Sequence, residues 1–169
     1  QGLATIAGGN YSHAQGSNTT ASGNFSHAQG SSTTASGTNS HAQGDRTIAS
    51  VDSAHAEGKL TTASGAASHA EGRDTKAIGE DSHAQGNATI ASGGASHAGG
   101  ASVVASGQTS FVHFIASGGT YGAYGNQSAI LGGINNNINS GAHSSVILGG
   151  LNNVVDTNTE RSVVLGGQS

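Results

Sequence analysis

The sequence predicts an all-β fold, a parallel β-roll or solenoid built from stacked coils of fourteen residues. A Ser-His-Ala triplet returns every fourteen residues, with a glycine three positions after each histidine. A second strip, Thr-x-Ala-Ser-Gly, lies between the triplets with the same period. Glycine accounts for 29 of 169 residues, the hydrophobic fraction is 33%, and proline, cysteine, methionine and tryptophan are absent. Self-similarity at a short fixed period indicates stacked repeats, and this composition suits a narrow core of small side chains.

Each coil divides into two heptads, which we interpret as a strand of about five residues followed by a two-residue turn. Glycines such as Gly9, Gly16 and Gly23 mark the heptad phase, and the turn positions hold polar pairs such as Ser17-Asn18 and Asp45-Arg46. Polar residues of this kind favour turns. A heptad is also the period of a coiled coil, but the chain has no apolar seam, and glycine at every seventh position disfavours a helix.

Alternation along a strand separates an inner from an outer set of side chains. Ser12, Ala14 and Gly16 share one side, which we predict to be the interior, and His13 and Gln15 share the other. The alanines expected inside are Ala14, Ala28, Ala42, Ala56, Ala70, Ala84 and Ala98. The threonines expected inside are Thr5, Thr19, Thr33, Thr47, Thr61, Thr75 and Thr89. We expect the inner serine and threonine hydroxyls to form hydrogen bonds up the stack.

Two outward faces remain, and they differ in how much the residue type varies from coil to coil. One carries a variable position, occupied by Thr20, Thr34, Ile48, Thr62, Lys76, Ile90 and Val104. The other repeats histidine next to glutamine or glutamate, and a repeated outward side chain implies a repeated environment, most simply another copy of the same chain. The predicted interface between chains comprises His13, Gln15, His27, Gln29, His41, Gln43, His55, Glu57, His69, Glu71, His83, Gln85, His97, Val146 and Leu148.

The period divides the chain into three regions. Residues 1–107 hold the fourteen-residue repeat, and residues 108–127 form a junction in which Phe111 stands in the histidine position and Phe114 in a glycine position. The spacing of glycines there stretches from seven to eleven, between Gly107 and Gly118. Residues 128–169 have a period of seventeen, marked by Ser-x-x-Leu-Gly-Gly, and we expect this roll to continue in a longer parent protein.

The units Ser-x-Ala-x-Gly and Thr-x-Ala-x-Gly, seven apart and paired into fourteen, resemble the YadA-like head repeats of trimeric autotransporter adhesins. The aliphatic units that begin at Ser128 and Ser145 are similar to another version of that strand. The resemblance implies a left-handed parallel β-roll, a homotrimer and an exposed fibrous head. The histidine column is a departure, because the family more often places aliphatic residues there. Similar repeats also occur in phage and viral fibre proteins.

The histidine column raises two chemical interpretations. In a threefold assembly each of His13, His27, His41, His55, His69, His83 and His97 would form a ring of three imidazoles, a ligand set suited to zinc or nickel. The preferred interpretation is structural, with neutral imidazoles hydrogen-bonded to glutamine or glutamate across the interface and no metal or other cofactor. Since histidine protonates near pH 6.5, we expect acid below about pH 5.5 to loosen the first region.

The sequence favours a binding or structural role over catalysis. Ser12 and His13 are adjacent in a strand, so their side chains point to opposite faces, and no phosphate-loop or nucleophile-elbow motif is present. Five basic residues against nine acidic ones disfavour nucleic acid as a partner, and no apolar run is long enough for a membrane helix.

We therefore expect an adhesive or structural segment of a trimeric extracellular fibre on a cell surface, with a host-surface protein or glycan as its ligand. One alternative is the shaft of a virion or phage tail fibre. A second alternative is a solenoid that binds ice, glycan or matrix through an outward face.

Overall fold

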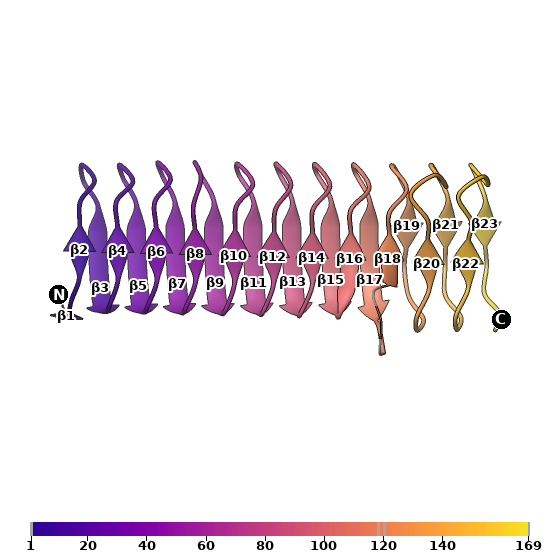
Figure 1. The fold of residues 1–169 in the computed structure, drawn as a ribbon, viewed down its shortest axis with the longest axis horizontal. Helices are drawn as coiled ribbons and strands as arrows, with labels where there is room; N and C mark the ends of the chain where they lie inside the picture. Colours follow the sequence, from indigo (N-terminus) through magenta and orange to yellow (C-terminus); the bar gives the residue numbers. More distant parts are fainter. Residues whose placement is uncertain (1, 118, 120, 169) are drawn as a thin grey trace.

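The computed structural model, which describes residues 2–117, 119 and 121–168, is an elongated solenoid of two parallel β-sheets (Figure 1). Odd-numbered strands form a twelve-stranded sheet and even-numbered strands an eleven-stranded one. Every pairing within each sheet is parallel, as between β5 (His27–Ser31) and β7 (His41–Asp45). The predicted all-β, parallel solenoid is therefore confirmed. Within the described ranges, no helix is long and apolar enough to span a membrane.

The remaining strands of the first sheet are β1 (Gly2–Leu3), β3 (His13–Ser17), β9 (His55–Lys59), β11 (His69–Arg73), β13 (His83–Asn87), β15 (His97–Ala101), β17 (Phe111–Ile115), β19 (Ala129–Ile130), β21 (Val146–Ile147) and β23 (Val163–Val164). The strands of the second sheet are β2 (Ile6–Ala7), β4 (Thr20–Ala21), β6 (Thr34–Ala35), β8 (Ile48–Ala49), β10 (Thr62–Ala63), β12 (Lys76–Ala77), β14 (Ile90–Ala91), β16 (Val103–Ala105), β18 (Tyr121–Ala123), β20 (Asn137–Ile138) and β22 (Val154–Val155).

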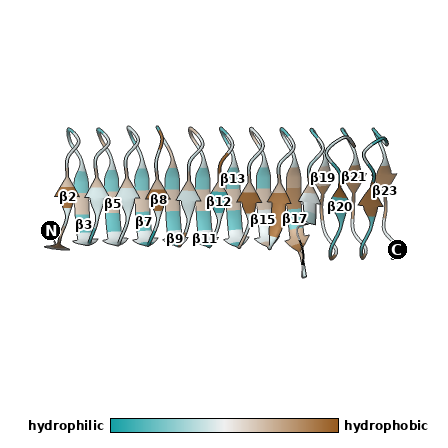
Figure 2. Cartoon of the chain, in the orientation of Figure 1, coloured by the Kyte–Doolittle hydropathy of each residue, from teal (hydrophilic) through white to brown (hydrophobic). Residues whose placement is uncertain are grey.

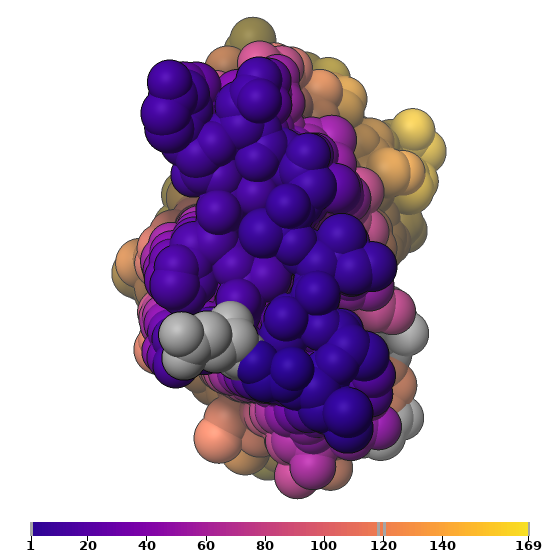
Figure 3. Space-filling view, turned by 90° about the vertical axis from the view of Figure 1, so that its left-hand side faces the viewer, coloured from indigo at the N-terminus to yellow at the C-terminus, as the bar shows by residue number. Residues whose placement is uncertain are grey.

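From β3 to β15, each residue of the first sheet pairs with the residue fourteen positions further along the chain. His27 pairs with His41, and Ala28 with Ala42, so identical side chains stack directly above one another. Figure 3 looks along the solenoid from its N-terminal end and shows the coils of residues further along the chain largely hidden behind the first. The fourteen-residue coil is confirmed.

The core lies between the two sheets and consists of two columns of small residues. Ala28, Ala42, Ala56 and their equivalents in the first sheet are buried, as predicted, and they face a column in the second sheet that includes Ala35 and Ala49. Both columns enlarge toward the C-terminus. In the first sheet the alanines give way to Val112, Ile130, Ile147 and Val164, and in the second sheet to Ile138 and Val155. Longer coils therefore enclose larger side chains.

The prediction that the inner serine and threonine hydroxyls form hydrogen bonds up the stack is wrong for the first region. Five serine hydroxyls, from Ser12 to Ser82, bond within their own turn, as Ser26 Oγ donates to the Gly23 carbonyl at 2.6 Å, whereas Ser96 Oγ has no hydrogen-bond partner. Thr33 and Thr47 are fully buried as predicted, yet their Oγ1 atoms have no hydrogen-bond partner. No acceptor therefore lies within hydrogen-bond distance of these two hydroxyls.

An amide ladder replaces the threonine column in the third region. Asn153 donates its backbone N–H to Asn136 Oδ1 at 2.9 Å, and Asn136 Nδ2 donates to the Gly150 carbonyl at 3.2 Å. Both side chains are buried. The longer amide reaches groups in the adjacent coil that a threonine hydroxyl cannot reach.

The strands of the second sheet are shorter than predicted. β4 has two residues, whereas the sequence suggested about five. The amides of Ser22 and Gly23 both donate to the Ala35 carbonyl, at 2.9 Å and 3.4 Å. Two donors on one acceptor bend the chain away from the ladder, and the strand ends there.

Each corner of the coil places one residue in the left-handed region of backbone conformation. Up to Thr109 this residue recurs at every seventh position, and it includes Asn18 (φ 54°), Asp74 (φ 57°) and even Leu60 (φ 59°). Its amide donates to the previous coil, as Asn18 N–H does to the Leu3 carbonyl at 2.8 Å. This ladder holds bulky residues such as Leu60 in a conformation that they rarely adopt.

The junction inserts four residues into one coil. Phe111 pairs with His97, and Phe114 with Gly100, which confirms that they stand in the histidine and glycine positions. The structural equivalent of Gly107 is Gly125, because an added Cβ on Gly107 would lie 2.0 Å from the Gly125 carbonyl oxygen. The predicted next glycine, Gly118, lies outside the described residues. Both sheets continue through the junction into coils of seventeen residues.

Candidate functional site: the histidine–glutamine face

The histidine–glutamine face is the outer side of β3 to β15, formed by the histidine column and the adjacent column from Gln15 to Gln85. The strand register brings all seven predicted histidines together in one column. Neighbouring ring centroids lie 4.6–5.0 Å apart. Most pairs are stacked or tilted, but His83 and His97 meet edge to face. His97 stacks on Phe111 at 4.9 Å, which closes the imidazole ladder at the junction.

The ladder contains polar atoms that the chain leaves unsatisfied. The Nε2 atoms of His55, His69 and His83 are shielded from solvent and have no hydrogen-bond partner, although the residues as a whole are half-buried. His41 differs, since its Nε2 lies 3.4 Å from Gln43 Oε1. A shielded nitrogen without a partner is destabilising unless another group meets it.

Burial and stacking favour the neutral imidazole. Burial lowers the pKa values of His27, His55 and His97, and a neighbouring imidazole lowers each of them further. The carboxylates of Glu57 and Glu71 act in the opposite direction on the pKa of His55, but more weakly. At neutral pH these rings therefore present uncharged nitrogens.

Acidification is expected to lower the melting temperature between pH 7.5 and pH 5. The pKa values of His27, His55 and His97 are lower in the folded than in the unfolded chain, whose histidines titrate near pH 6.5. Their contribution to stability is therefore present above about pH 6.5 and is lost as the pH falls through the folded values. Each kcal/mol lost lowers the melting temperature by about 2–4 °C in a chain of this size. Thermal unfolding followed by circular dichroism tests this, and equal melting temperatures at the two pH values would contradict it.

Two carboxylates interrupt the glutamine column in adjacent coils. Glu57 and Glu71 are paired in register on β9 and β11. His55 Nε2 lies 3.7 Å from Glu57 Oε2, and His83 Nε2 lies 3.5 Å from Glu71 Oε1. An open groove of about 630 Å³ runs past both glutamates and reaches His113 at the junction.

The same face continues beyond the histidines as an apolar surface. The histidine column extends to Phe111, Ala129, Val146 and Val163. The neighbouring column extends to His113, and then to leucines that are 50% (Leu131), 42% (Leu148) and 76% (Leu165) exposed. Figure 2 shows the change from teal bands across β3 to β13 to brown at β17 and β23.

Sequence analysis placed Val146 and Leu148 on this face but missed Leu131 and Leu165. The recurring Ser-x-x-Leu-Gly-Gly unit would have identified both of them, since its leucine always holds the same position.

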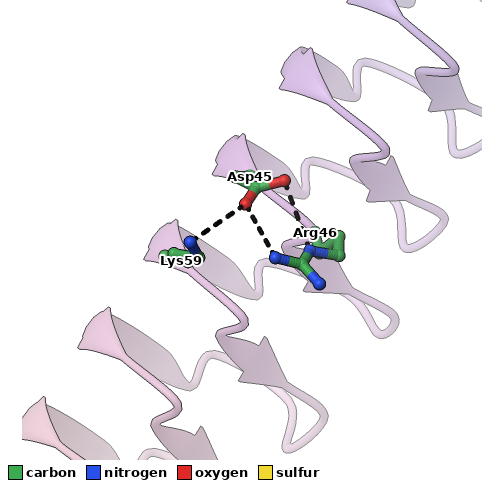
Figure 4. Close-up of polar contacts among 3 residues, drawn as sticks. All are labelled: Asp45, Arg46 and Lys59. Carbon is green, nitrogen blue, oxygen red and sulfur yellow. Dashed lines mark hydrogen bonds and ion pairs between the residues drawn. The ribbon is translucent and has the colours of Figure 1, made fainter.

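An exposed group of charged side chains lies at the ends of two strands. Asp45 pairs with Arg46 at 3.1 Å and with Lys59 at 3.8 Å at the ends of β7 and β9 (Figure 4). The hydrogen bond from Arg46 lowers the pKa of Asp45. Exposed ion pairs of this kind contribute little to stability.

The serine and histidine of each triplet are directed to different places. Ser40 Oγ donates to the Gly37 carbonyl at 2.6 Å on the inner side, and the His41 ring stacks in the outer column. The hydroxyl and the imidazole of this triplet therefore do not face each other.

No protein-family model matches this chain, and no curated protein is significantly similar to it.

Proposed function

We propose that the chain is a segment of a homotrimeric extracellular fibre that presents repetitive surfaces for attachment at a cell or virion surface. The coil would be left-handed, as the resemblance to YadA-like head repeats implies, and the histidine–glutamine face would pack against the other two chains. Attachment would draw on many weak repeated contacts along three chains, because multivalency raises avidity without any single strong site.

The observation that carries the proposal is the continuity of one unpartnered face along the whole solenoid. It begins with half-buried imidazoles such as His55 and His69, whose Nε2 atoms have no hydrogen-bond partner. It ends with Leu131, Leu148 and Leu165, which are aligned and exposed. A partner for both the histidines and the leucines must repeat with the spacing of the coils and must change from polar to apolar at the same position along the solenoid. Another copy of the chain, aligned in register, meets both conditions.

A virion or tail-fibre shaft would use the same architecture, and the genes beside this one distinguish the two settings. An outer-membrane anchor favours the adhesin, and virion structural genes favour the fibre. A solenoid that binds ice, glycan or matrix would use the outward column that includes Thr20 and Thr34, because the inner threonines Thr33 and Thr47 are fully buried between the sheets.

Light scattering tests the assembly. The expected mass is three times the 16.3 kDa of one chain. Leu148→Lys places a charge on the proposed interface and is expected to reduce the trimer fraction. Val154→Lys is the matched control, because Val154 is also exposed (57%) but belongs to the second sheet. A stable monomer, or equal effects of the two variants, would contradict the proposed interface.

A further inference from the structure

The glutamine column contains two glutamates in adjacent coils, where like charges repel. Glu57 and Glu71 are direct partners in the parallel ladder, in which neighbouring strands lie about 4.8 Å apart. Among the described residues, neither forms an ion pair with a lysine or arginine, and Lys59 pairs with Asp45 instead. Like charges placed opposite each other on one face are destabilising, so this pair calls for a compensating cation.

A third ligand lies beside the pair. One ligand atom each from Glu57, His69 and Glu71 lies within 4.8 Å of the other two. Independently, His69 Nε2 is shielded from solvent and has no hydrogen-bond partner. An imidazole beside two carboxylates offers a position for a cation, because a cation would compensate both negative charges and take a ring nitrogen as a further ligand.

We propose that Glu57, His69 and Glu71 bind one divalent transition-metal ion, of which zinc is the model case, on the histidine–glutamine face. A single chain supplies all three ligands, so the site does not depend on the trimer. Zinc binds imidazole nitrogen and carboxylate oxygen at about 2.0–2.2 Å, and three protein ligands leave a fourth position for water. Rotation of the side chains would bring ligand atoms that now lie within 4.8 Å of one another to the shorter spacing of that geometry.

The chemistry of the ligands selects the class of metal. Imidazole suits zinc, copper, nickel and iron, whereas calcium and magnesium prefer oxygen ligands only. In the single chain, the open groove beside the glutamates lets the ion enter from solvent. His55 and His83, which lie 3.7 Å and 3.5 Å from the carboxylates, can orient them or act as further ligands.

Titration calorimetry with zinc chloride at pH 7.5 tests the site on the intact chain. We expect one zinc ion per chain and a rise in melting temperature when zinc is added, because a ligand that binds the folded state stabilises it. Glu57→Gln with Glu71→Gln restores the glutamine of the neighbouring coils and is expected to fold normally. This variant should lose at least about 10–100-fold in zinc affinity, the loss that removal of an outer-sphere partner alone produces.

A second pair of variants separates this site from binding by the whole histidine ladder. His69→Gln should abolish binding, whereas His27→Gln, in a coil without carboxylates, should leave zinc affinity unchanged. Gln15→Glu with Gln29→Glu rebuilds the same cluster around His27 and should raise the stoichiometry to two ions per chain. No zinc binding by the wild type, or equal binding by the wild type and the Glu57→Gln/Glu71→Gln variant, would overturn the proposal. Its failure would leave the light-scattering test of the trimer unaffected.

Discussion

Gly44→Ala is expected to destabilise the solenoid by more than about 4 kcal/mol, an exceptionally large effect for one methyl group. Gly44 has φ +127°, and a Cβ built on it would lie 2.0 Å from the carbonyl oxygen of Gly58 in the next coil. The obstacle is backbone that belongs to the sheet ladder, so it cannot move without breaking the pairing of β7 with β9. The positive φ adds about 1–3 kcal/mol of strain for any residue with a side chain. Urea unfolding followed by circular dichroism measures the change.

Gly94→Ala is the matched control for this prediction. A Cβ at Gly94 would meet no atom within 4 Å, and we expect a change of less than about 0.5 kcal/mol. If Gly44→Ala were as stable as Gly94→Ala, the close approach of neighbouring coils at Gly44 would be disproved.

Ala42→Leu is expected to destabilise the chain by about 1–3 kcal/mol or more, because overpacking a filled core forces side chains and backbone to shift. Ala42 is fully buried between the sheets and stacks between Ala28 and Ala56. Aliphatic residues occupy the same column only where the coils are longer, as at Ile130 and Ile147. A fourteen-residue coil lacks the extra backbone that makes room for them.

Ala66→Leu controls for the change in residue type. Ala66 is exposed at a corner of the coil, so we expect little change in the urea midpoint. Equal stability of the two variants, or a stable Ala42→Leu protein, would show that the inner face had been assigned wrongly.

The sequence predicted the coil length and most side-chain orientations because period and strand alternation act at every position. It predicted the burial of Ala42 and Thr47 and the alignment of His41 with His55 in one outward column. It did not predict the short strands of the second sheet or the unpaired threonine hydroxyls. Both depend on which carbonyl lies opposite a given donor in the next coil, and a period alone does not give that geometry.

The glycines that were expected inside also show what the period alone does not predict. The sequence predicted that Gly16 and its equivalents in later coils lie inside. Two of these equivalents, Gly58 and Gly72, are exposed and have φ +108°. Their role is the backbone conformation and the close approach of adjacent coils, not the filling of the core. Alternation assumes a regular strand, and positive φ ends that regularity.

Some features of the candidate cation site follow from the sequence, and others only from the structure. By itself, the sequence determined that His69 and Glu71 share a face and that Glu57 belongs to the same column, because both facts follow from the period. Only the tertiary structure decided that the Nε2 of His69 is shielded and unpartnered, and that its coil brings both carboxylates within reach. Ring stacking and the register between coils set these distances, and both arise from packing between residues fourteen positions apart.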